Sequence, residues 1–200
     1  MRVSLGGIGM EVETITTKVD FCLPPPSPVS CFPFPSRKCK MMCLEKKGYL
    51  MESLKPYLEK SCFSPNLNAD TKARVLAELT DLFIANGDLS VEHRQAVIDA
   101  LWERESKMST GMQLGIAIPH AKIAQVDRLI VGIALSPQGI DFDSLDRQFS
   151  NIFIVTLSPM DEIGTHVRFL ADISQRLSND AVRDKLLKCE THAEMLRTLC

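Results

Sequence analysis

Apolar residues in the region that follows Met51 recur at the spacing of helix faces. One run follows Asp70, a candidate N-terminal cap, and ends at Gly87, and its apolar positions are Val75, Leu76, Leu79, Leu82 and Phe83. A second run follows Ser90, another candidate cap, and its apolar positions are Val97, Ile98, Leu101 and Trp102. These two runs predict amphipathic helices that each bury one face.

The middle of the chain carries three short segments typical of β-strands, at residues 114–118, 129–135 and 152–157. The latter two are almost entirely apolar, as expected for strands buried on both faces of a sheet. Residues 136–139 read Ser-Pro-Gln-Gly, which predicts a turn directly after the second segment.

Two further helices are expected toward the C-terminus. The first has an apolar face at steps of four, three and four, made by His166, Leu170, Ile173 and Leu177. Thr191 and Glu194 have the spacing of a capping box for the second. Helices before, between and after mostly apolar strands, without a strict strand–helix repeat, predict an α/β fold. We expect a mixed β-sheet covered by helices on both faces, an α/β/α sandwich.

Residues 1–50 differ in composition from the rest of the chain. They hold six of the eleven prolines, and prolines at this density exclude helices and sheet ladders. Their net charge is +3, whereas residues 51–200 carry −5, which together give the overall −2. We therefore expect a disordered Pro/Cys-rich extension at 1–50 and one folded domain at 51–200. A proline-rich docking segment is the alternative for the extension.

Composition also narrows the classes of function. A mildly acidic domain has no electrostatic footprint for DNA or RNA, so no nucleic-acid partner is expected. No run approaches the ~18 apolar residues of a membrane span, and none suggests a signal peptide, so we expect a cytoplasmic protein without membrane insertion. The N-terminal cysteines lack the short paired spacing of zinc ligands, and no metal or cofactor is expected. Without a glycine-rich phosphate loop, direct use of ATP is not expected.

The strongest chemical signal is the segment Gly-Ile-Ala-Ile-Pro-His-Ala at residues 115–121. It predicts a buried strand that stops at Pro119, which cannot donate to a sheet ladder, and that leaves His120 at the strand end. Imidazole is a good nucleophile that is largely neutral near pH 7. Arg104 lies at the end of the second helix along its apolar face, and His166 lies in the first turn of a later helix. Each also fits a structural role, as a satisfied core histidine or an arginine at a helix C-terminus.

Four features together resemble the type-2 enzyme IIA domain of the bacterial sugar phosphotransferase system. They are the Arg-Glu pair at 104–105, the Ser-Thr-Gly loop at 109–111, the strand end before His120, and a helix that opens with His166. The resemblance covers residues 51–200. The four features together are specific for this family, whereas each feature alone is weak evidence. One departure is Gln113, where the family usually has a small residue, often glycine.

The resemblance implies that His120 accepts a phosphoryl group on its ε nitrogen from a histidine phosphocarrier protein. It further implies that Arg104 and His166 stabilise this group, that Thr110 and Gly111 belong to the binding loop, and that no metal is needed. Positioning and charge stabilisation dominate phosphoryl transfer, which suits these side chains.

The destination of the phosphoryl group has two interpretations. A regulatory domain of the nitrogen-related branch is favoured, because 200 residues leave no room for a permease or a second carrier domain. The alternative is a component that feeds a cysteine on an enzyme IIB domain of a fructose- or mannitol-type permease. A partner-binding module of the same fold without phosphotransfer also stays open. A metal hydrolase that uses His120 and His166 is a remoter alternative, since it lacks a third ligand at helical spacing.

Overall fold

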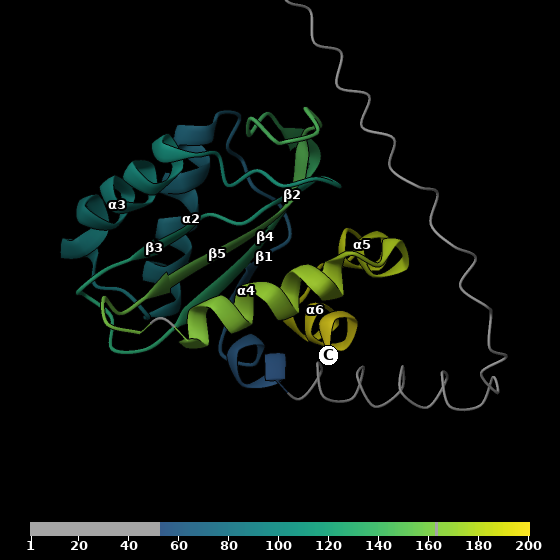
Figure 1. The fold of residues 1–200 in the computed structure, drawn as a ribbon. Coiled ribbons are helices and arrows are strands. Elements are labelled where there is room, and N and C mark those ends of the chain that lie inside the picture. Colours follow the sequence, from purple (N-terminus) through teal and green to yellow (C-terminus); the bar gives the residue numbers. More distant parts are fainter. Residues whose placement is uncertain (1–52, 163) are drawn as a thin grey trace, which may run out of the picture.

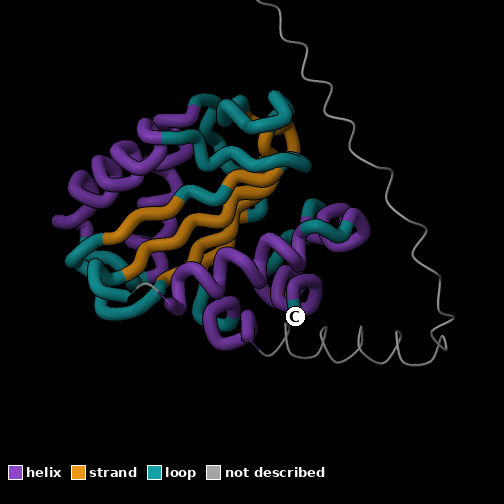
Figure 2. The backbone as a smooth tube through the Cα atoms, viewed as in Figure 1, coloured by secondary structure: helices purple, strands orange, loops and turns teal. Residues whose placement is uncertain are grey.

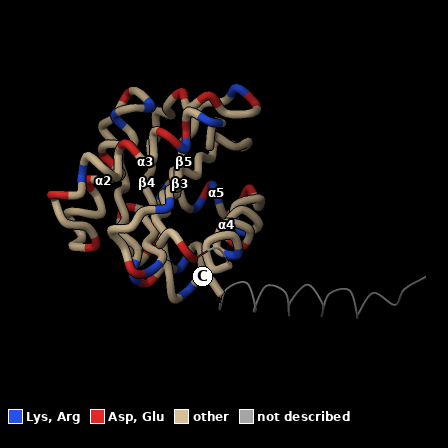
Figure 3. The backbone as a smooth tube through the Cα atoms, turned by 60° about the vertical axis from the view of Figure 1, so that its left-hand side comes forward, with Lys and Arg blue, Asp and Glu red and all other residues tan. Residues whose placement is uncertain are grey.

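The computed structural model of the chain describes residues 53–162 and 164–200. The expected disordered extension at 1–50 lies outside these residues, and so does the expected domain start at Met51. Within the described part, helices enclose one five-stranded sheet (Figure 1). Basic and acidic residues are interspersed over the described part of the chain (Figure 3). No helix in this part is long and apolar enough to span a bilayer.

The sheet is mixed, as expected. Its strands are β1 (Cys62–Ser64), β2 (Ile116–Ala117), β3 (His120–Lys122), β4 (Ile130–Ile140) and β5 (Ser150–Ser158). The spatial order is β1-β4-β5-β2, and β3 also pairs with β5, beyond the end of β2. β4 and β5 are antiparallel, whereas β1 runs parallel to β4, and β2 and β3 run parallel to β5. The two long apolar segments therefore form the centre of the sheet.

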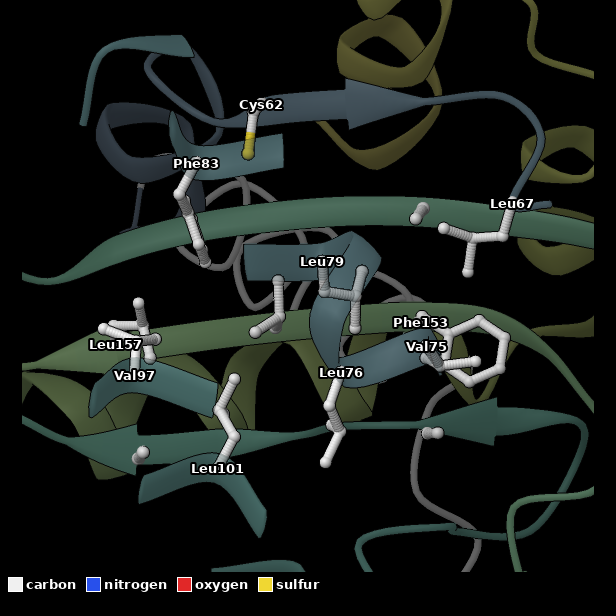
Figure 4. Packing of buried hydrophobic residues seen from close by; sticks show 14 of the residues in the cluster. Cys62, Leu67, Val75, Leu76, Leu79, Phe83, Val97, Leu101, Phe153 and Leu157 are labelled. Atoms are coloured by element: carbon white, nitrogen blue, oxygen red, sulfur yellow. The ribbon is translucent and has the colours of Figure 1, made fainter. Parts of the chain in front are cut away.

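Helices α2 (Lys72–Asn86) and α3 (Arg94–Lys107) cover one face of this sheet (Figure 1). Their buried apolar side chains pack against the sheet (Figure 4), and these are Val75, Leu76, Leu79, Phe83, Val97 and Leu101. α2 ends where Gly87 takes the left-handed conformation, at φ 81°. Both predicted helices are thus confirmed, with their apolar stripes on the sheet.

Three details of these helices differ from expectation. Thr71 rather than Asp70 is the cap residue of α2, and the Asp70 carboxylate instead accepts from Arg74 Nη1 at 3.1 Å. Ser90 makes no side-chain cap bond, because a 3₁₀ turn (Val91–His93) intervenes before α3. Trp102 is 48% exposed, since one step along a helix turns it about 100° away from the buried stripe.

The opposite face is covered by the helical residues 53–58 and by α4 (Gly164–Leu177), α5 (Asp180–Leu186) and α6 (His192–Leu199). The capping box of Thr191 and Glu194 is present at the start of α6. Figure 2 shows the strands as one layer with helices on either side. The predicted α/β/α sandwich is therefore confirmed.

The expected turn at residues 136–139 is wrong, because β4 continues through it. Gly139 adopts φ 73°, and the pairing with β5 shifts register between Leu135 and Ile140. The side-chain amide of Asn151 donates to the carbonyl of Ser136 at 2.9 Å across the irregular stretch. The proline and glycine here produce a bulge-like irregularity that keeps the strand going, because the neighbouring β5 supplies hydrogen-bond partners.

Candidate functional site

His120 lies where the chain leaves one short strand and begins another. β2 ends at Ala117 and β3 begins at His120, and both run parallel to β5. Between them, the Pro119 carbonyl accepts from the Thr156 N–H of β5 at 3.0 Å. The predicted strand end at Pro119 is thus a break along one edge of the sheet, and the flanking pairs hold the backbone of His120 in place.

Two opposite hydrogen bonds fix the tautomer of the His120 ring. Nδ1 lies 2.9 Å from the carbonyl oxygen of Ile118, which only accepts, so Nδ1 carries the proton. Nε2 lies 3.0 Å from Nε of Arg104, which only donates, so Nε2 carries the lone pair. The nitrogen with nucleophilic character is therefore Nε2, and it faces the guanidinium.

The surroundings of His120 keep its ring neutral. Burial of the ring lowers its pKa, and the positive charge of Arg104 lowers it further, against an opposing effect of the hydrogen bond to Ile118. A neutral imidazole retains the free electron pair that an attack on phosphorus needs. The site thus favours the reactive form near pH 7.

Arg104 reaches His120 from the last turn of α3. Its Nη1 donates to the Met108 carbonyl at 2.9 Å, one turn further along the chain. This second bond anchors the guanidinium while Nε points at His120. The placement of Arg104 along the inward line of α3, predicted from spacing, is what brings the two side chains together.

His166 approaches His120 from the first turn of α4. The two ring centroids are 5.4 Å apart, with the planes tilted by 51°. His166 is only 6% exposed, and its pKa is lowered to about 4, mainly by burial and further by repulsion from Lys122 and from any proton on His120. Two neutral imidazoles and one arginine therefore converge at the sheet edge, from three elements far apart in sequence.

Glu105 is a part of the site that the sequence reasoning did not single out as a functional residue. Its carboxylate accepts from Lys72 Nζ at 2.8 Å and from the Thr110 N–H at 2.9 Å, with Ser109 Oγ at 2.9 Å as a third donor. Burial alone would raise the pKa of Glu105, but the hydrogen bonds from Lys72 and Thr110 outweigh it and hold the pKa below its usual value. Its position beside Arg104 was the available signal. Glu105 ties the loop at 109–111 to α3.

Thr110 and Gly111 shape this loop through their contacts with the protein. Thr110 donates both its N–H and its hydroxyl to Glu105, and its carbonyl accepts from Ile118 N–H at 3.0 Å. Gly111 pairs with Ala117, and a Cβ there would lie 2.8 Å from the Phe142 carbonyl oxygen. The loop therefore supports the strand that leads to His120, and ligand binding by these two residues stays a prediction.

Gln113 lies in an exposed stretch of the same loop. The two residues after it, Leu114 and Gly115, both take left-handed conformations, at φ 66° and 71°. Asp146 accepts from the Leu114 N–H at 2.9 Å and so supports the strained residue. The loop turns just after Gln113, which needs no small side chain at that position.

No group of three His, Cys, Asp or Glu side chains that could hold a metal ion lies within residues 53–162 and 164–200. The converging groups supply one nucleophilic nitrogen and one planar cation beside it, the arrangement that suits transfer of an anionic group to a nitrogen.

Comparison with known proteins identifies the family of this chain. The family model of the phosphoenolpyruvate-dependent sugar phosphotransferase system, EIIA 2, matches residues 56–200. The chain is 38% identical over 121 residues to the fructose-specific EIIA component of Haloferax volcanii, which covers 60% of this chain and 77% of that protein. It is 29% identical over 147 residues to the nitrogen regulatory protein of Escherichia coli, which covers 73% and 88%. The crystal structure of nitrogen regulatory protein IIA-Ntr from Neisseria meningitidis shares the fold, with a TM-score of 0.64 at 24% identity over 70% of this chain and 94% of that one.

The chain belongs to the EIIA 2 family of the phosphoenolpyruvate-dependent sugar phosphotransferase system. The match covers well over half of the chain and contains all three side chains of the site. Members of this family are phosphotransfer components, and the relatives include both a fructose-specific and a nitrogen regulatory protein.

Proposed function

We propose that His120 is a phosphoryl acceptor and donor, charged by a histidine phosphocarrier protein of the phosphotransferase system in the cytoplasm. The observation that carries this proposal is the 3.0 Å contact between Arg104 Nε and His120 Nε2, in a tautomer that leaves the lone pair on Nε2. Family membership supports the same role, because the site residues lie within the matched region.

The transfer itself needs only groups that the two proteins supply. The lone pair of His120 Nε2 forms the new N–P bond while the P–N bond to the donor imidazole breaks, and the electron pair stays on the donor nitrogen. His120 keeps its Nδ1 proton against the Ile118 carbonyl, so its ring becomes a phosphorylated imidazolium. A donor ring that is protonated on its other nitrogen leaves as a neutral imidazole, so the positive charge passes from one ring to the other and no proton has to move. As the phosphoryl group arrives, Arg104 exchanges its bond to Nε2 for bonds to the phosphoryl oxygens. His166, at the start of α4, is placed to add a further donor.

Two destinations for the phosphoryl group have specific support. The 38% identity to a fructose-specific EIIA component favours delivery to a cysteine on an enzyme IIB domain. The longer match to a nitrogen regulatory protein, 73% of this chain against 60%, favours a regulatory role in which phosphorylation changes the affinity for partner proteins. Regulation is the destination expected from the sequence, and the two share the same first step.

Intact-mass analysis tests that first step. Incubation with phosphoenolpyruvate, enzyme I and the phosphocarrier should add one phosphate that acid removes, because a phosphoramidate hydrolyses in acid whereas a phosphoserine survives. His120→Ala should abolish the adduct. His93→Ala is the matched control, since His93 lies in the 3₁₀ turn beside Glu92, and it should keep the adduct. A phosphate that persists in His120→Ala would overturn the assignment, and no adduct on the wild type would favour a binding module.

Transfer from the phosphorylated protein discriminates the destinations. Mixing it with a fructose-type IIB domain should move the label to a IIB cysteine if the protein serves transport. Retention of the label on His120 in the presence of IIB would favour regulation.

A further inference from the structure

Three buried polar atoms lack a hydrogen-bond partner within residues 53–162 and 164–200. They are Thr156 Oγ1, Ser158 Oγ and His166 Nδ1. The side chains of Thr156 and Ser158 are fully buried, and His166 is 6% exposed. Buried polar groups without partners cost stability, so their persistence in one place calls for a functional or solvent partner.

The two hydroxyls lie on the same face of the sheet as His120. Their neighbours Val155 and Leu157 belong to the core under α2 and α3, and so does Ala121 of β3. Because side chains alternate along a strand, Thr156, Ser158 and His120 point to the opposite face, toward α4. The strand register places Thr156 beside His120 and Ser158 beside Lys122.

His166 approaches His120 from α4, which covers the face of the sheet to which both hydroxyls point. It belongs to the buried side of α4, its ring is 5.4 Å from that of His120, and its pKa responds to the charge of Lys122. Lys122 Nζ itself donates to the Met160 carbonyl at 3.3 Å. Among the described residues, Thr156 and Ser158 are therefore the buried hydroxyls without a partner on the face that α4 covers, and His166 Nδ1 is the buried ring nitrogen without one.

The chemistry of the two histidines requires opposite tautomers. Nδ1 of His120 faces a carbonyl, which forces the proton onto Nδ1 and leaves Nε2 as the nucleophile. A neutral His166 that is to stabilise phosphoryl oxygens must donate from Nε2, and its Nδ1 must then accept. A hydroxyl or a water is able to donate there, whereas a carbonyl is not.

We propose that Thr156 and Ser158 are positioning residues, whose hydroxyls supply a hydrogen bond to His166 Nδ1 and so hold His166 with its proton on Nε2. The three atoms have no direct bond to one another, and a bridging water, which makes roughly three contacts in a protein interior, would link them. This inference rests on the proposed phosphoryl transfer to His120 and names residues that act on the phosphoryl group through His166.

Nitrogen-15 NMR of the histidine rings tests the tautomer without any phosphotransfer. In the unphosphorylated wild type, His166 should carry its proton on Nε2 and His120 on Nδ1. The double variant Thr156→Val, Ser158→Ala keeps approximate side-chain volumes but removes both hydroxyls, and it should move a measurable fraction of His166 to the Nδ1–H form. The single variant Thr156→Ser keeps a hydroxyl at this position, so its His166 ring should give the same nitrogen-15 spectrum as the wild type.

Phosphorylation by the carrier gives the second readout. The double variant should be phosphorylated roughly fivefold more slowly, the loss expected for one neutral hydrogen bond. Thr80→Val is the matched control, since Thr80 is a buried threonine on α2 whose hydroxyl donates to Leu76, and it should change neither the spectrum nor the rate.

The outcomes separate this inference from the proposed function. His166 protonated on Nδ1 in the wild type, or a tautomer unchanged in the double variant, would overturn the inference even if His120 is phosphorylated. Equal slowing by Thr80→Val would reduce the effect to general destabilisation and would also overturn it. A wild type that shows the expected tautomers but never accepts phosphate would refute the proposed function and leave the positioning contact standing.

Discussion

Arg104 serves two acceptors with one planar group, donating from Nε to His120 and from Nη1 to the Met108 carbonyl. Such a fork holds its direction even when one acceptor is exchanged for a phosphoryl oxygen. A lysine ammonium has no fixed plane and would swing with its flexible stem. We therefore expect the shape of the guanidinium, as well as its charge, to decide how well the site would receive a phosphoryl group.

Substitution of Arg104 should separate shape from charge. Arg104→Ala should slow phosphorylation of His120 at least roughly tenfold, because loss of one charge-assisted contact in the transition state costs about 1.4 kcal/mol or more. Arg104→Lys should recover only part of the rate. Quenched-flow intact mass measures both. Arg74→Ala is the control, since Arg74 pairs on the surface with Asp70, and it should leave the rate unchanged. A wild-type rate in Arg104→Ala would make Arg104 a helix-end residue only.

At the scale of elements, α3 and the loop that follows it act as one unit through Glu105. The buried carboxylate binds Lys72 of α2 and the loop residue Thr110. Thr110 in turn accepts a hydrogen bond from Ile118, in the segment that leads to His120. The helix that carries Arg104 and the strand that leads to His120 are thus held in one frame.

Glu105→Gln should loosen that frame. The amide keeps the size of the side chain but loses the charge that faces Lys72. Its NH2 group is a donor, whereas the groups around it, from Lys72, Ser109 and Thr110, are donors as well and need an acceptor. Removing one partner of a buried ion pair costs on the order of 3 kcal/mol, and we expect urea denaturation to show a loss of that order. The phosphorylation rate should fall as well. Glu103→Gln is the matched control, because the Glu103–Lys107 pair is exposed on the same helix and should matter little.

The spacing of apolar residues along the chain predicted those helices and strands that bury a large apolar surface. The strands around Val131 and Ile154 and the helix faces of α2, α3 and α4 all followed from spacing. The three-residue β1 was missed, because three residues show no period, and the turn at 136–139 was misassigned because β5 supports an irregular strand there. His120, Arg104 and His166 were singled out from sequence, and the structure brings all three together.

Other parts of the site could not be read from the sequence. The carboxylate of Glu105 looks like any charged helix residue until Lys72, from another helix, is known to face it. Thr156 and Ser158 look like polar interruptions of an apolar strand, and their importance depends on which face of the sheet α4 covers. Such contacts depend on long-range packing, which periodicity does not encode.

At the scale of the whole molecule, the folded unit should be independent of residues 1–50. A protein that begins at Met51 should keep the full-length thermal midpoint and phosphorylation rate, because a proline-rich segment without periodicity cannot bury enough apolar surface to offset its ordering. Differential scanning calorimetry and the mass assay measure both. A lower midpoint or lost phosphotransfer would mean that the extension packs on the domain.

A protein that begins at Cys62 provides the contrast. It lacks Leu54 and Leu58, both fully buried against the α4 face of the sheet, and should lose roughly 4 kcal/mol or more of stability. The boundary of the domain would then lie between these two starts.

The break between β2 and β3 at Pro119 affects how other proteins are able to bind at this edge of the sheet. A sheet edge normally offers a row of free N–H and C=O groups, to which a foreign chain is able to add as a further strand. Here residues 110–112 already pair with the outer side of β2, and β3 is only three residues long and follows a proline, so no long row of free groups remains to template such growth. We therefore expect a protein that reaches His120 to recognise side chains and to dissociate again, which is the kind of contact that the proposed transfer between successive proteins requires.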